Sequence, residues 1–210
     1  MADSFTLTIF RHGLTIENEK RQYLGWTDAA LSARGVSESL SVAGQIKAMS
    51  PDKLITSDLI RCRQTAKLLF PSENQIEMED FREMNFGEFE GKSYGDLKNN
   101  KSYQEWLDSA FKIPPINGES FDFFSNRIWN GMKKALDILD EEDRELVIMS
   151  HGGVIRLLLS RLVESGKEFF DWNIPNSQAY QLKWENIESF RRLEKCKSLS
   201  VVPSMEKING

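Results

Sequence analysis

Histidine, cysteine and excess positive charge are scarce in this chain of 210 residues, which has two histidines, two cysteines and a formal net charge of −5. Cys62 and Cys196 form no series of spacings, so we expect unpaired thiols in a reducing compartment rather than a disulfide framework. The acidic balance argues against general binding to nucleic acid or to a membrane surface, because both need a broad basic field. The sequence shows no signal-peptide pattern and no apolar run of membrane-spanning length. We therefore predict a cytoplasmic protein.

Short apolar runs alternate along the chain with longer segments of helical periodicity, and 40% of the residues are hydrophobic, enough for one sizeable core. This alternation is typical of a mostly parallel sheet covered by helices on both faces. The sequence therefore predicts an α/β fold with three layers, α/β/α. The predicted strands are 5–10, 53–57, 75–78 and 145–149, and the predicted helices are 31–49, 59–70, 120–140 and 154–163.

Two regions depart from this alternation. Residues 82–119 are longer than a usual connection, so we expect a lid-like insertion there that is partly helical. Near the C-terminus, residues 178–184 and 188–195 predict two strands of a hairpin. The tail from Ser198 has little periodicity and is expected to be loose. We predict that residues 1–210 form a single domain.

Both histidines follow a predicted strand and precede a glycine, in "TLTIFRHGLTIEN" and in "ELVIMSHGGVIR". Ligands of an open α/β sheet bind beyond the carboxyl ends of the strands, so His12 and His151 meet in one crevice if their strands are neighbours. Gly152 allows close approach of a ligand, and the helix that begins there favours an anion at its N-terminus. The alternative for each histidine is a hydrogen-bonded side chain at a strand end without a chemical role.

Arg11, beside His12, indicates a phosphate pocket rather than a metal site, because its charge repels a cation. A guanidinium fits phosphate oxygens and keeps a neighbouring imidazole neutral, which leaves a nitrogen lone pair to attack phosphorus. Arg61 lies one turn into a predicted helix and can reach the same crevice, whereas Arg63 and Lys67 are expected to face water. We expect no metal and no other cofactor.

Expelling an alcohol from a phosphate ester requires a proton donor. Glu83 follows the third predicted strand and is the first candidate, and Glu88 and Glu90 on the same segment are alternatives. A solvated carboxylate without a role is the other interpretation of each. Cys62 is expected to be a small core residue, because tyrosine-phosphatase chemistry needs an arginine at position 68, where this chain has Leu68.

Taken together, these motifs resemble those of the histidine phosphatase superfamily, in its phosphoglycerate-mutase-like branch. The segments "RHGLTIEN", "LGWTDAALSARG", "SDLIRCRQTA" and "SHGGVIR" are similar to motifs of that family in the same order, and "FREMNFGEFEGKSY" looks like a segment of its phosphatase members. Leu14 stands where the family usually has Glu or Gln. The resemblance implies a phosphoglycerate-mutase-like fold in which His12 becomes phosphohistidine and Glu83 donates the proton. It implies a phosphate pocket of Arg11, Asn18, Arg61 and His151.

Within that family the chain looks most like the alpha-ribazole phosphatases of cobalamin assembly and their broad-specificity relatives. The resemblance implies a phosphatase of a small phosphorylated metabolite, with alpha-ribazole 5′-phosphate as the expected substrate and with neither nucleic acid nor membrane as a partner. The alternatives are a broad-specificity phosphatase, a phosphoglycerate mutase and a non-catalytic protein that binds a phosphorylated ligand. The aromatic residues of the insertion fit either a core or a base-stacking surface, namely Phe86, Phe89, Tyr94, Tyr103 and Trp106.

Overall fold

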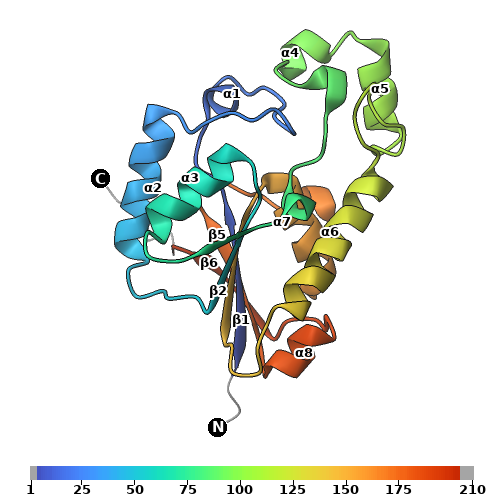
Figure 1. Ribbon diagram of the computed structural model, residues 1–210. Helices are drawn as coiled ribbons and strands as arrows, with labels where there is room; N and C mark the ends of the chain where they lie inside the picture. The colour runs from blue at the N-terminus through green and yellow to red at the C-terminus, as the bar shows by residue number, and fades with distance from the viewer. Residues whose placement is uncertain (1–3, 204–210) are drawn as a thin grey trace.

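A six-stranded sheet forms the centre of the protein, in a computed structural model that describes residues 4–203 (Figure 1). The strand order is β3-β2-β4-β1-β5-β6. The first four of these strands are parallel to one another, and β5 pairs antiparallel with both β1 and β6. The strands are β1 Phe5–Arg11, β2 Lys53–Thr56, β3 Gln75–Glu77, β4 Glu145–Ser150, β5 Ala179–Trp184 and β6 Ser198–Val202.

Helices cover both faces of the sheet, with α2 and α3 on one side and α6 and α7 on the other (Figure 1). The fold is therefore the predicted three-layer α/β/α arrangement with a mostly parallel sheet. No helix within residues 4–203 is long and apolar enough to cross a membrane. The α-helices are α1 Ile16–Glu19, α2 Ala33–Gln45, α3 Ile60–Leu69, α4 Tyr94–Leu97, α5 Lys101–Asp108, α6 Phe121–Asp137, α7 Gly152–Leu162 and α8 Ile187–Arg191, and the 3-10 helices are η1 Glu79–Phe81, η2 Gly87–Phe89 and η3 Phe169–Asp171.

The two central strands are apolar on both sides, because successive side chains of a strand point to opposite faces. Ile9 of β1 and Ile148 of β4 belong to the core under α6 and α7. Their neighbours Phe10 and Met149 belong to the core under α2 and α3. All four side chains are fully buried. This two-sided burial explains why the sequence shows continuous apolar runs here rather than an apolar and polar alternation.

The C-terminal part differs from the prediction in two respects. Residues 188–195 do not form a strand, because Asn186 caps a helix: the amide of Ser189 donates to its side-chain oxygen at 2.9 Å, and α8 follows. The predicted loose tail is wrong for Ser198–Val202, which forms β6 against β5. As a partly exposed edge strand, β6 has a weak apolar pattern. The tail beyond residue 203 lies outside the described residues.

The segment between β3 and α6 carries η2, α4 and α5, which lie above the carboxyl ends of the strands at the top of Figure 1. Its aromatic residues are mainly core. Phe89, Tyr103 and Trp106 are buried, and their rings contact one another. Tyr94 differs, with 63% of its surface exposed. Most of the aromatic composition of this segment therefore serves its own packing.

Candidate active site

The two histidines follow directly after neighbouring parallel strands, as the sequence led us to expect. Arg11 at the end of β1 is opposite Ser150 at the end of β4, so the next residue on each strand is a histidine. The ring centroids of His12 and His151 are 5.1 Å apart, and the planes are inclined at 62°. Both side chains are buried. The sheet itself therefore brings together two imidazoles from distant parts of the chain.

The ring of His12 is fixed in one tautomer by the backbone. Its Nδ1 lies 2.7 Å from the carbonyl oxygen of Gly13, to which it donates, so the unprotonated nitrogen of the neutral ring is Nε2. Burial holds the pKa of His12 well below its usual value, and the charges of Arg61 and Arg11 lower it further. His12 thus offers a neutral imidazole with a lone pair on Nε2 at neutral pH.

His151 is held by two side chains, Ser57 and Arg61, from the segment that follows the neighbouring strand β2. Arg61 Nη2 lies 3.2 Å from Nδ1, and because guanidinium nitrogens only donate, this Nδ1 accepts. The proton of the neutral ring is then on Nε2, which lies 2.9 Å from Oγ of Ser57. Burial, followed by the charge of Arg61, lowers the pKa of His151 well below its usual value. Ser57 is a contact that the sequence analysis did not find.

Two guanidinium groups, that of Arg61 fully buried and that of Arg11 partly buried, lie near the histidines. Arg61 is fully buried and donates to the carbonyls of Gly25 at 2.7 Å and Thr27 at 3.0 Å. Arg11 donates to the carbonyl of Ile174, and burial lowers its pKa to about 10. Within residues 4–203, the Nε atom of each of these two arginines is buried without a hydrogen-bond partner. Buried N–H groups without partners are costly, and an anion can satisfy them.

Glu83 lies at the start of α7, where its carboxylate is bound by backbone amides. Oε2 accepts from Gly153 at 2.9 Å, and Oε1 accepts from Met84 at 2.9 Å. A Cβ on residue 153 would lie 2.2 Å from Oε1, so only glycine allows this approach. The carbonyl of Glu83 also accepts from Trp26 Nε1 at 2.9 Å and Arg127 Nη2 at 3.1 Å. The residue is therefore held at both its backbone and its side chain.

The two alternative carboxylates have structural partners instead. Glu90 accepts from the amides of Trp26 and Thr27, each at 2.7 Å, and so fixes the loop between α1 and α2. Glu88 accepts from the hydroxyl of Ser102 at 2.9 Å. Neither contacts the histidine crevice in these bonds, which favours Glu83 as the acid.

Asn18 and Gly152 complete the predicted set. The side-chain oxygen of Asn18 accepts from the amide of Thr15, in the capping box of α1, and from Asn176 Nδ2, each at 3.3 Å. The same Asn176 nitrogen lies 3.1 Å from the carbonyl oxygen of His12, so Asn18 is tied to the backbone of the histidine. Gly152 begins α7, and a Cβ there would lie 3.6 Å from Cζ of Arg11. The predicted site residues are thus connected by a series of contacts around the two histidines.

The sequence analysis did not find three residues that support the site through hydrogen bonds, namely Arg127, Trp26 and Asn176. Arg127 of α6 pairs with Glu119 at 2.5 Å and also donates to the carbonyl of Asp80 at 2.8 Å. Trp26 and Asn176 contribute the bonds given above. Glu119 and Arg127 are further apart in sequence than the three or four positions over which helical pairs are expected, so no local pattern indicates their contact.

Cys62 is a core residue, as predicted. It is fully buried in the core under α2 and α3, and its sulfur lies 3.4 Å from Nε2 of His151. Burial raises the pKa of this thiol to about 12, so it stays protonated at neutral pH. Cys62 and Cys196 are both free thiols. In the described part of the chain, no group of three or more His, Cys, Asp or Glu side chains is placed to hold a metal ion.

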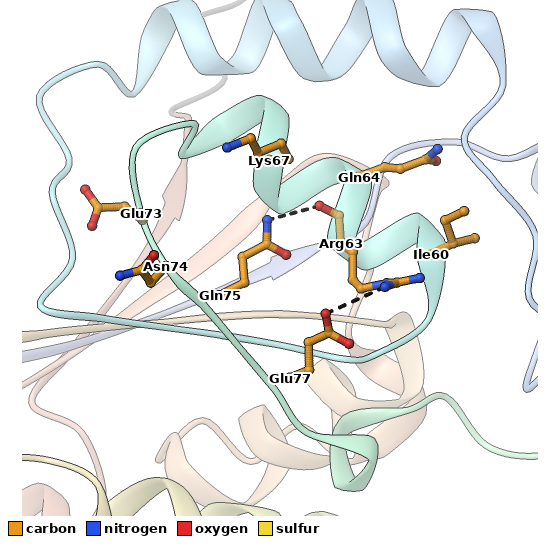
Figure 2. A pocket seen from close by; sticks show the side chains of 8 residues that line it. All are labelled: Ile60, Arg63, Gln64, Lys67, Glu73, Asn74, Gln75 and Glu77. Atoms are coloured by element: carbon orange, nitrogen blue, oxygen red, sulfur yellow. Dashed lines mark hydrogen bonds and ion pairs between the residues drawn. The ribbon is translucent and has the colours of Figure 1, made fainter.

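A separate hollow of about 490 Å³ lies between α3 and β3 (Figure 2). Arg63 is paired there with Glu77 at 3.6 Å, and Gln75 donates to the carbonyl of Arg63 at 3.3 Å. Lys67 is exposed at its edge, as predicted. None of the crevice residues lines this hollow, so we do not assign the chemistry to it.

Comparison with known proteins gives the same family throughout. The family described as Histidine phosphatase superfamily (branch 1) matches residues 7–194. The chain is 29% identical, over 162 residues, to the adenosylcobalamin/alpha-ribazole phosphatase of Escherichia coli, covering 75% of this chain and 78% of that protein. It is 25% identical to the 2,3-bisphosphoglycerate-dependent phosphoglycerate mutase of Chlamydia muridarum, covering 85% of this chain and 93% of that protein. The crystal structure of the alpha-ribazole phosphatase from Shigella flexneri superimposes with a TM-score of 0.76 at 25% identity, covering 85% of this chain and 90% of that chain. This protein therefore belongs to the histidine phosphatase superfamily, branch 1.

Proposed function

We propose that the protein is a phosphomonoesterase that hydrolyses a small phosphorylated metabolite through a phosphohistidine on His12. The observation that carries this proposal is the setting of His12. Its ring is buried and neutral, its Nδ1 is bound to a backbone carbonyl, and two arginines and a second histidine lie around it. A neutral imidazole with a fixed tautomer beside cationic groups is a nucleophile suited to a phosphate dianion.

In the first step, Nε2 of His12 forms a bond to phosphorus while the bond from phosphorus to the ester oxygen breaks. Glu83 takes up a proton when the phosphate dianion binds beside it and gives this proton to the departing oxygen, so the alcohol leaves neutral. Charge on the other phosphate oxygens is stabilised by hydrogen-bond donors fixed before the substrate arrives. These donors are Arg11, Asn18, Arg61 and the backbone at Gly152, and His151 joins them once its Nε2 proton turns from Ser57 to the phosphate.

In the second step, a water molecule attacks the phosphohistidine. Glu83, now a carboxylate, takes a proton from this water, the oxygen bonds to phosphorus, and the bond from phosphorus to nitrogen breaks. Inorganic phosphate leaves, and both His12 and Glu83 return to their starting forms. The arginines supply the positive charge that a magnesium ion supplies in other phosphoryl-transfer enzymes.

We propose alpha-ribazole 5′-phosphate as the substrate, and the cytoplasm as the location. The names of the relatives support this substrate, because phosphatases of Escherichia coli and Salmonella typhimurium that resemble the chain are named for alpha-ribazole. The free thiols fit a reducing compartment. The broad-specificity phosphatase and the phosphoglycerate mutase, the second supported by the Chlamydia relatives, are the rival activities.

A phosphate-release panel tests the proposal. It compares alpha-ribazole 5′-phosphate, 3-phosphoglycerate, a fructose bisphosphate and an aryl phosphate, with His12→Ala as the inactive control. We expect the highest kcat/KM for alpha-ribazole 5′-phosphate. We also expect mass spectrometry of the wild-type protein, sampled during turnover and handled without acid, to detect phosphorylated His12. Transfer of the phosphate to a second monophosphate would identify a mutase, and binding of phosphate without release from any ester would identify a non-catalytic protein.

A further inference from the structure

A cavity of about 230 Å³ opens beside the Glu83 carboxylate and the two residues, Met84 and Gly153, whose amides anchor it. Glu83 and Gly153 form part of its wall, and most of the rest is aromatic. We call it the aromatic pocket and define it by Tyr23, Trp106, Phe111, Phe124, Phe169 and Phe170. We propose that it binds a flat, apolar ring of the alcohol that leaves the phosphate. This inference rests on the proposed phosphatase function and assigns that function a class of substrate.

The position of Glu83 gives the pocket its role. A proton donor has to contact the departing oxygen, so the alcohol leaves the phosphate on the side where Glu83 stands. The pocket wall includes Glu83 itself and, on α7, Arg156. Gly153 in this wall follows Gly152, where a Cβ would lie 3.6 Å from Cζ of Arg11, so the wall adjoins the phosphate-binding arginine. The pocket therefore begins where the leaving group begins.

The rings of the pocket form a continuous surface. Trp106 and Phe111 are stacked, with centroids 4.1 Å apart and planes inclined at 19°. Phe111 meets the edge of Phe170 at 5.1 Å, and Phe170 meets Phe169 at 5.0 Å. The ring of Phe170 is 59% exposed at the rim. An exposed phenyl beside other rings gains burial when a flat ring enters, through offset or edge contacts.

The backbone at Phe111 is strained in order to place its ring there. Phe111 has φ 68°, and Ala110 before it has φ 52°, which is the left-handed region that residues other than glycine rarely adopt. The strained residues are held by bonds from the amide of Phe111 to the carbonyl of Trp106 and from the amide of Phe121 to the carbonyl of Phe111, each 2.9 Å. Strain kept in place by surrounding contacts concentrates at ligand sites.

The volume of the pocket limits its occupant. Sites for whole drug-sized ligands measure roughly 300–1,000 Å³, and this one is smaller. It has room for one ring system, while the phosphate and the linking part of the substrate lie outside it towards His12. Besides Glu83 and Gly153, the polar groups of the wall are Arg156, the Tyr23 hydroxyl, which is bonded to that of Tyr103 at 2.6 Å, and Trp106 Nε1, which has no partner within residues 4–203. The pocket therefore selects mainly for a flat apolar shape.

The test compares two esters, 2-phenylethyl phosphate and ethyl phosphate, whose leaving alcohols are of similar acidity. We expect kcat/KM to be at least ~10-fold higher for the phenyl ester, because burying a ring is favourable by the usual area rule. In Phe170→Ala and in Phe111→Ala this ratio should fall towards one. The control is Phe123→Ala, since Phe123 is 75% exposed and does not line the pocket, and the ratio should there stay at its wild-type value.

Phe170 is the decisive variant, because an exposed ring can be removed without loss of folding, whereas Phe111→Ala is to be checked by circular dichroism. Equal efficiency with both esters in the wild-type protein would overturn the pocket assignment while leaving the phosphatase in place. A ratio that persists in Phe170→Ala and in folded Phe111→Ala would overturn it too. No phosphate from any ester, p-nitrophenyl phosphate included, would instead disprove the proposed function, and with it the assignment.

Discussion

The amide of Gly153 donates a 2.9 Å hydrogen bond to the carboxylate of Glu83, so the helix that follows His151 also holds the proposed proton donor. The anion that the sequence led us to expect at the start of α7 is thus, in part, a side chain of the protein itself. A helix N-terminus stabilises a carboxylate there through its unpaired amides and its dipole. The N-terminus of α7 therefore positions both His151, the proposed ligand of the phosphate, and Glu83, the proposed acid.

Gly153→Ala should displace the Glu83 carboxylate while it leaves His151 in place. The added Cβ would lie 2.2 Å from Oε1 of Glu83, so the carboxylate has to move, while His151 keeps its own bonds. We expect a folded protein whose turnover of an alkyl phosphate falls by ~100-fold or more, the usual scale of general-acid loss. Gly44→Ala is the control, because nothing lies within 4 Å of its added Cβ. Full activity in Gly153→Ala would show that the position of Glu83 is unimportant.

Glu83→Gln should hurt two kinds of substrate unequally. An aryl phosphate leaves as a stabilised anion that needs little protonation, whereas a sugar or alkyl alkoxide needs a proton in the transition state. We expect a far larger loss of phosphorylation rate on an alkyl phosphate than on p-nitrophenyl phosphate, measured in single turnover. Glu88→Gln is the matched control, and in this variant the ratio of the phosphorylation rates on the two substrates should stay at its wild-type value. Equal losses on both substrates in Glu83→Gln would rule out its role as the acid.

The two histidines should make the free energy of unfolding depend on pH. Their pKa values are lowered in the folded protein, so the unfolded chain binds more protons as the pH falls below about 6.5. We expect stability to be at its full value above that pH and to fall as the pH decreases further, by up to ~1.4 kcal/mol per pH unit for each histidine. Urea unfolding at several pH values measures this pH dependence of the free energy of unfolding.

The same pKa shifts can be observed directly. Because the chain has only two histidines, nuclear magnetic resonance resolves each ring without ambiguity once His12→Gln is compared with the wild type. Neither ring should titrate between about pH 7.5 and about pH 6, where an ordinary histidine does. A midpoint near the ordinary value for either ring would contradict its neutral, buried state.

Arg127→Ala should destabilise the protein and disturb the acid. Arg127 binds Glu119, which is 12% exposed, and also the carbonyls of Asp80 and Glu83. Removing it leaves a largely buried carboxylate without its partner, which costs ~3 kcal/mol or more. Arg34→Ala, which breaks an exposed pair with Glu38, should lower the free energy of unfolding far less, because water screens that pair. A loss in Arg127→Ala no larger than in Arg34→Ala would contradict the structural role.

Turnover should survive a chelator. The positive charge at the crevice comes from Arg11 and Arg61, which are covalent parts of the chain, so dialysis against EDTA should leave kcat within about twofold of its starting value, less than a kcal/mol in barrier height. Added magnesium or zinc should not raise it. A loss in EDTA that either metal restores would show that the pocket needs a metal ion.

The sequence predicted correctly the features that follow from hydrophobic periodicity and from the positions where strands end. Ile9 and Ile148 belong to apolar runs long enough to indicate buried parallel strands, and the pairing of those strands then places His12 beside His151. The prediction from the sequence was wrong near the C-terminus, where a single capping contact decides between a strand and a helix. Asn186 turns an apparent strand into a helix through a cap, which the period-2 pattern concealed.

The supporting residues of the site illustrate the same limit. Ser57 touches His151 because it follows β2, which pairs with β4, whereas Trp26 touches Glu83 because two separate loops meet. A serine before a helix and a tryptophan in a polar segment each have an ordinary local explanation. Their roles depend on the tertiary arrangement, which one sequence does not encode in any short spacing.

The position of β1 in the sheet also bears on how the chain is made. Its two neighbours, β4 and β5, both lie in the last third of the sequence. During synthesis, the apolar strand Phe5–Arg11 therefore leaves the ribosome long before either partner exists, and both of its edges stay open until Glu145–Ser150 emerges. Pairings of such long sequence separation form slowly and leave strands prone to aggregation meanwhile. The nascent chain thus has reason to depend on a chaperone for its first strand.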